Sequence, residues 1–101
     1  MMRRLGLLVL AGTMIAGSAD AAFVKRKMLL ESCSGANEKD CTGYIVGVAD
    51  ASEGQVCVGD VRVPAMKAKV LGWLKAHKQE SEAPAAPWVL DALKASYPCG
   101  K

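Results

Sequence analysis

The residues best suited to chemistry in this 101-residue chain are four cysteines and a single histidine, His77. A catalytic thiol would need His77 as its base and would leave an odd thiol among the four. A metal site would usually show a closely spaced cysteine pair, but these cysteines are 8, 16 and 42 positions apart. Disulfides are the preferred interpretation, because an even cysteine count is typical of small exported domains. The cysteines are Cys33, Cys41, Cys57 and Cys99.

Other candidate catalytic groups are weaker. Asp50 and Glu53 could act as paired carboxylates, and an enzyme could use either of them with His77. Two carboxylates three residues apart are more commonly part of a solvated helix face. No serine lies in a G-x-S-x-G turn, and no phosphate-binding or calcium-binding loop is present. The residues therefore predict a binding module with no catalytic site, cofactor or metal.

The first 21 residues have the pattern of an export signal. Arg3 and Arg4 precede an apolar run, and small residues surround a cleavage site after Ala21. We expect residues 1–21 to be a cleaved signal peptide and residues 22–101 to be one soluble domain without a membrane anchor. As a helix the apolar run would span only about 18 Å of a hydrocarbon core about 30 Å thick. The formal charge is only +3, which gives no electrostatic basis for binding nucleic acid.

The spacing of apolar residues predicts an all-α domain of four helices. The first helix is expected over Val24–Ser32. A second, over Cys41–Glu53, would have Asn37 as its N-cap in a capping box with Asp40, and Gly54 just beyond its end. Two further helices are expected to begin near proline residues. The apolar stripe of the third helix consists of Met66, Val70, Trp73, Leu74 and His77. The fourth helix follows Pro84 and Pro87, and its apolar face consists of Val89, Leu90, Leu93 and Tyr97.

Helix geometry narrows the three ways in which four cysteines can pair. Cys41 and Cys57 flank the second helix, whose ends would be about 18 Å apart, so that pairing is disfavoured. Cys33 and Cys41 lie at the two ends of a short loop in a helical hairpin. The preferred set is Cys33–Cys41 with Cys57–Cys99.

Three residues within the helices call for a structural explanation. Gly43 and Gly47 interrupt the second helix, where each costs about 0.5–1 kcal/mol relative to alanine. We expect them to allow close packing against another helix, with a groove for a partner as the alternative. Trp88, at the start of the last helix, is expected to be partly exposed.

The order of residues resembles the Rap/Tai family of immunity proteins. The resemblance is strongest from Cys41 to Asp50, where C-T-G-Y-I-V-G-V-A-D keeps the spacing of both glycines, the tyrosine and the aspartate. It extends from Leu29 to Cys99 and includes the segment Trp73–His77. One departure is Lys78, where relatives commonly have a proline.

This resemblance implies a small, helical, disulfide-bonded protein of the Gram-negative periplasm. Characterised members bind peptidoglycan amidase toxins delivered by type VI secretion and occlude their Cys-His active site. Some members act as dimers, so a second copy of the chain is also a candidate partner. The alternative function is a general periplasmic stress protein or chaperone of similar build.

Two polar connections are free to contact a toxin, because helix faces committed to the core cannot enter a cleft. The first is Ser34–Asp40, held by the Cys33–Cys41 bridge, and the second is Lys78–Glu82. The expected partner-binding residues are Glu38, Lys39, Lys78, Gln79, Glu80 and Glu82.

Overall fold

The computed structural model describes residues 23–35, 37–78 and 80–100. Over these ranges the chain forms four helices, which are α2 (Arg26–Ser34), α3 (Glu38–Ala51), α4 (Val63–Ala76) and α5 (Ala85–Ser96). Apart from two isolated bridges, the described ranges contain no β-structure. The all-α fold is therefore confirmed. The proposed signal peptide, residues 1–21, lies outside the described residues.

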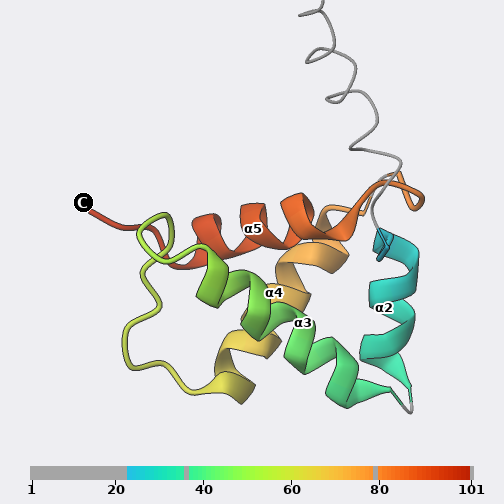
Figure 1. The fold of residues 1–101 in the computed structure, drawn as a ribbon, viewed down its shortest axis with the longest axis horizontal. Coiled ribbons are helices and arrows are strands. Elements are labelled where there is room, and N and C mark those ends of the chain that lie inside the picture. The colour runs from blue at the N-terminus through green and yellow to red at the C-terminus, as the bar shows by residue number, and fades with distance from the viewer. Residues whose placement is uncertain (1–22, 36, 79, 101) are drawn as a thin grey trace, which may run out of the picture.

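Helices α3 and α5 form the centre of the domain. Each contacts the other three helices, whereas α2 and α4 are not in contact over the described ranges. In Figure 1, α2 stands across one end of α3, and the connection from α4 to α5 passes over the start of α2. None of the helices in these ranges is long and apolar enough to cross a membrane.

The core is built from the apolar stripes that the sequence predicts. In α4, Met66, Val70 and Leu74 are buried at successive turns, as the four-residue spacing requires. The stripe ends there, because Trp73 is half-buried and His77 is the exposed C-cap. The last helix also buries one face, with Val89, Ala92 and Leu93 fully enclosed.

Both expected disulfides are present. Cys33 and Cys41 join α2 to α3 with their Cα atoms 4.9 Å apart. Cys57 and Cys99 join the α3–α4 connection to the C-terminal segment with a Cα separation of 5.1 Å. Beside the second bridge, the Cys57 N–H donates to the Tyr97 carbonyl oxygen at 2.8 Å. Each end of α3 is thus linked to another part of the chain.

The predicted ends of α2 and α3 need correction. α2 begins and ends two residues later than expected, and α3 begins at Glu38 and ends at Ala51. Asn37 is the N-cap of α3, but its side chain makes no capping bond. Its carbonyl oxygen instead accepts from the Asp40 N–H at 3.0 Å, so the expected capping box does not form. The C-cap is Ser52, which leaves Gly54 two residues beyond it with φ +96°.

Two expectations about packing are wrong. Gly43 and Gly47 are exposed, and a Cβ atom added to either would meet no other atom within 4 Å, so neither supports close packing of helices. Trp88 is only 3% exposed. Its indole N–H donates to the His77 carbonyl oxygen at 3.2 Å, and the Arg26 guanidinium lies 5.0 Å from its ring centroid. Residues from two other parts of the chain therefore cover Trp88.

Candidate functional site

The first predicted connection is shorter than expected. Its residues Glu38, Lys39 and Asp40 form the first turn of α3, and the connection itself is only residues 35–37. Two carboxylates in that turn suit the partial positive charge of a helix N-terminus. The Cys33–Cys41 bridge holds this turn against α2, and Cys41 is completely buried. The first turn of α3 is therefore held at a corner of the domain beside α2.

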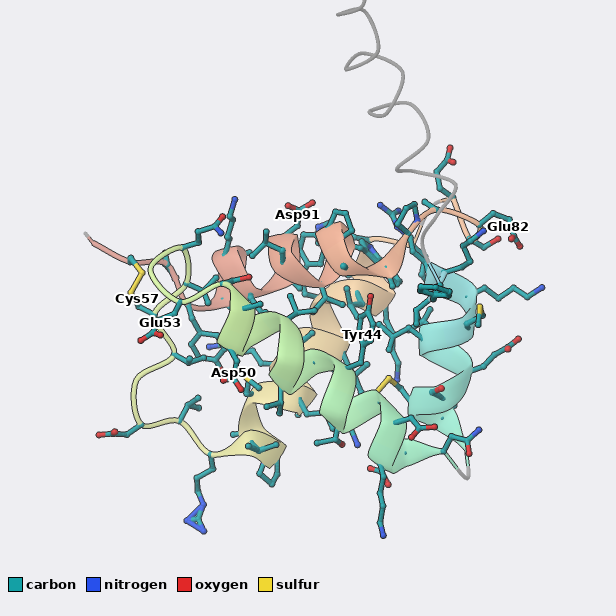
Figure 2. The ribbon with its side chains drawn as sticks, in the orientation of Figure 1. Tyr44, Asp50, Glu53, Cys57, Glu82 and Asp91 are labelled. Carbon is teal, nitrogen blue, oxygen red and sulfur yellow. A yellow bond between two sulfur atoms is a disulfide. The ribbon has the colours of Figure 1, made fainter. Side chains whose placement is uncertain are left out.

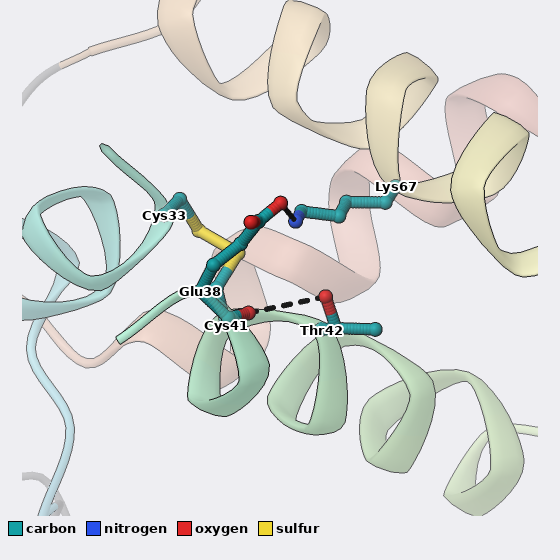
Figure 3. A network of polar contacts seen from close by, with 5 residues as sticks. All are labelled: Cys33, Glu38, Cys41, Thr42 and Lys67. Atoms are coloured by element: carbon teal, nitrogen blue, oxygen red, sulfur yellow. Dashed lines mark hydrogen bonds and ion pairs between the residues drawn. A yellow bond between two sulfur atoms is a disulfide. The ribbon is translucent and has the colours of Figure 1, made fainter. Parts of the chain in front are cut away.

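Glu38 in this corner is already engaged within the chain. Its carboxylate pairs with the Lys67 ammonium group of α4, as Figure 3 shows. The hydrogen bond from Lys67, with its nearby charge, lowers the pKa of Glu38 below the ordinary 4.5. The Lys67 side chain is 13% exposed and that of Glu38 64% exposed, so the pair lies at the surface with its cation covered. Lys39 is exposed beside it and has no ion pair among the described residues.

The second predicted connection, Lys78–Glu82, is anchored to the start of α2. The N–H groups of Arg26 and Lys27 donate to the carbonyl oxygens of Ala83 and Ser81, at 2.9 and 3.0 Å. These are two of the donors that a helix N-terminus leaves without an intrahelical acceptor. A third bond, from the Ala83 N–H to the Glu80 carbonyl oxygen, closes a turn in which Glu80 has φ +48°.

The charged side chains of this connection are free to meet a partner. Lys78, Glu80 and Glu82 are exposed, and Figure 2 shows Glu82 at the end of the molecule where α2 begins. Gln79, the remaining candidate in this connection, lies outside the described residues. The hydrogen bonds hold the backbone of Ser81 and Ala83 in place, which lowers the backbone entropy lost on binding and suits recognition.

The two connections lie at opposite ends of α2 rather than side by side (Figure 1). The nine residues of α2 span about 14 Å at 1.5 Å per residue. A partner that touched both would also cover the outer side of α2, which the sequence analysis did not single out. The feature of the sequence that could have indicated this surface is the basic run Lys25–Lys27 at the start of a predicted helix.

A groove of about 330 Å³ lies between α2 and the second connection. We call it the basic groove, because three of its lining residues are cations. It is lined by Arg26, Lys27, Leu30, Lys78, Glu80, Ser81 and Trp88.

The candidate catalytic residues do not form a catalytic site. The His77 carbonyl oxygen accepts from Trp88 in the first turn of α5. The Cys57 N–H donates to the carbonyl oxygen of Tyr97, which follows the last turn of the same helix. The nine-residue step from Trp88 to Tyr97 therefore separates His77 from the region of Glu53 and Cys57 by about 14 Å along α5. Asp50 and Glu53 lie near Cys57 in Figure 2, and both are exposed.

His77 has a structural role at the end of α4. Its Nδ1 lies 2.8 Å from the Trp73 carbonyl oxygen, and its ring stacks on Trp73 with the centroids 3.8 Å apart. The four cysteines are all in disulfides. In the part of the chain that the structure describes, no group of His, Cys, Asp and Glu side chains could hold a metal ion. One further group is electrostatically perturbed, since partial burial raises the pKa of Tyr44.

Comparison with known proteins supplies one match. Residues 25–99 match the family described as Rap1a immunity proteins. The matched range contains all four described helices and both disulfides. No curated protein and no solved structure matches the chain.

Proposed function

The chain belongs to the Rap1a immunity proteins, and we propose that it neutralises a peptidoglycan amidase toxin delivered by type VI secretion. Membership in this non-enzymatic family implies that the chain binds a cognate toxin. Our finer proposal is that it occludes the toxin's active site. The family favours toxin immunity over the chaperone function considered as the alternative.

We propose that the chain acts in the periplasm. Two disulfides suit an oxidising compartment, where the toxin would meet its peptidoglycan substrate. Residues 1–21 would direct export and be removed, leaving a mature chain that begins at Ala22. Mass spectrometry of the chain isolated from the periplasm should give that N-terminus and a mass four hydrogens below the reduced form.

The observation that carries the proposal of occlusion is the anchored connection Lys78–Glu82. The bonds from Arg26 and Lys27 hold the backbone of Ala83 and Ser81 to α2, while the side chains of Lys78, Glu80 and Glu82 are exposed. A segment built in this way can enter a cleft without first losing much entropy. Its charge pattern would discriminate one toxin from another.

We propose a second contact at the corner that begins α3. Lys39 is exposed there, and the Lys67 pair holds Glu38 in place with most of its side chain still exposed. A dimer of the chain would also be compatible with this function, and light scattering of the purified mature chain would give its mass.

The test is co-purification with exported amidases encoded in the same genome, followed by binding measurements on variants. One variant replaces Lys78, Glu80 and Glu82 by alanine, and another replaces Glu38 and Lys39. At least one should weaken toxin binding by about tenfold or more, about 1.4 kcal/mol.

A matched control removes one cation and two carboxylates from the other end of the domain. Asp50, Glu53 and Arg62 are exposed there, so their replacement by alanine should leave both folding and toxin binding unchanged. If wild-type chain captures none of the amidases, the proposed function is wrong. If it captures one and both loop variants bind normally, only the proposed contacts are wrong.

A further inference from the structure

The lining of the basic groove carries an excess of formal positive charge. Its lining contains the three cations Arg26, Lys27 and Lys78 and the single carboxylate of Glu80, a net charge of +2. Lys27 and Lys78 are exposed, and neither forms an ion pair within the described residues. A negatively charged group could therefore approach both ammonium groups from solvent.

The stability of α2 does not explain these cations. Lys25 is the N-cap of the helix, Arg26 and Lys27 follow it, and no acidic residue occupies the first turn. Positive charge at a helix N-terminus opposes the helix dipole, at a cost of about 0.3–1 kcal/mol for each exposed charge. Arg26 packs over Trp88 within the domain, so the unfavourable placement points to an interaction outside the domain for Lys27.

The groove also offers an apolar surface beside its charges. Leu30 is half-buried and contributes the accessible apolar wall, whereas Trp88 lies beneath the Arg26 guanidinium and is only 3% exposed. The two most exposed large apolar side chains of the described residues, Phe23 and Met28, belong to the same part of the chain.

We propose that the basic groove receives an acidic segment of the toxin. A carboxylate of that segment lies between the ammonium groups of Lys27 and Lys78, and an adjacent aliphatic side chain packs on Leu30. This inference rests on the proposed function and extends its contact surface from the Lys78–Glu82 connection onto α2. Charge complementarity selects the occupant, because a basic or uncharged segment would leave the lysines without a partner.

The decisive variant is Lys27→Glu, which lies outside the connections already proposed as contacts. A carboxylate in the first turn suits the helix dipole, so the variant should melt no lower than wild type. Toxin binding should nevertheless weaken by at least tenfold, and by more in the double variant with Lys78→Glu. The loss should be larger at low salt than at high salt, since salt screens exposed charges. The matched control is Arg62→Glu, which also reverses one cation at the start of a helix but lies away from the groove.

Carbodiimide cross-linking gives an independent readout with the same exported amidase as the probe. The reagent joins a lysine amine to a carboxyl group in contact with it, so mass spectrometry should find Lys27 or Lys78 linked to an aspartate or glutamate of the toxin. Cross-links confined to other lysines would overturn the inference.

The two proposals fail in different ways. If wild type binds the amidase and Lys27→Glu binds equally well, the groove is not a contact, while the immunity function stands. If wild type binds none of the exported amidases, both proposals are wrong. If the chain binds anionic lipid vesicles through Lys27 and Lys78 while the variants still bind the toxin normally, the groove is a membrane-binding surface instead.

Discussion

Replacing Gly43 and Gly47 by alanine should stabilise the domain. Both glycines lie inside α3 and face solvent, and an added Cβ would meet no atom within 4 Å at either position. Neither has the positive φ that would make a side chain strained. Alanine therefore brings only the lower conformational entropy of the unfolded chain, about 0.5–1 kcal/mol at each site.

The double variant should gain about 1–2 kcal/mol in the free energy of unfolding. For a domain of this size, that corresponds to a rise in Tm of at least about 4 °C. The measurement is urea and thermal unfolding of the oxidised chain 22–101, followed by circular dichroism. Gly54→Ala is the matched control, because it also has open space but has φ +96°, so alanine should destabilise it.

A loss of stability in the Gly43→Ala/Gly47→Ala variant would refute this reasoning and restore close packing as the role of the glycines. The same variant has a second use. If it is more stable but no longer binds the toxin, the exposed face of α3 is a contact surface, which is the alternative that the sequence left open.

Three further changes test other parts of the structure. Lys67→Met should restore the ordinary pKa of Glu38. Because a lowered carboxyl pKa stabilises the fold only while the group is ionised, the variant should be less stable than wild type above pH 4.5, and this difference should vanish as the pH falls through the native pKa. Urea unfolding at several pH values measures the difference. Removing the Cys57–Cys99 bridge with two serines should cost about 2–5 kcal/mol in urea unfolding, and an unchanged midpoint would contradict its stabilising role. Trp88→Phe should cost about 1 kcal/mol because it removes the partly buried hydrogen bond from the indole N–H to the His77 carbonyl oxygen, and an equal or higher Tm would contradict that bond.

The parts of the fold that depend on local spacing were predictable from the sequence. Met66, Val70 and Leu74 recur every four residues, and all three are buried. The pairing of Cys33 with Cys41 followed from a short connection between two helices, because a helical hairpin brings its inner ends together. Pro64 lies within the first turn of α4, where its missing N–H has no consequence.

The features that depend on distant segments were not predictable in this way. The burial of Trp88 requires Arg26 and His77, which the chain brings from two other elements. Local spacing likewise does not reveal which face of α3 meets another helix, so Gly43 and Gly47 were assigned to the wrong environment.

The candidate site shows the same limit. Each charged connection was identifiable from composition, but their placement at opposite ends of α2 depends on the tertiary fold. The pair between Glu38 and Lys67 joins residues 29 positions apart, and no pattern in the sequence links them. The basic groove also needs α2 and the second connection together.

The most direct test of the proposed immunity function is inhibition of an exported amidase encoded in the same genome. The rate at which that enzyme hydrolyses purified peptidoglycan would be measured while the mature chain is titrated into the reaction. Occlusion of the active site predicts that hydrolysis falls in proportion to added chain and stops near equimolar protein. Hydrolysis that continues at the full rate in a large molar excess of folded, oxidised chain would contradict the account.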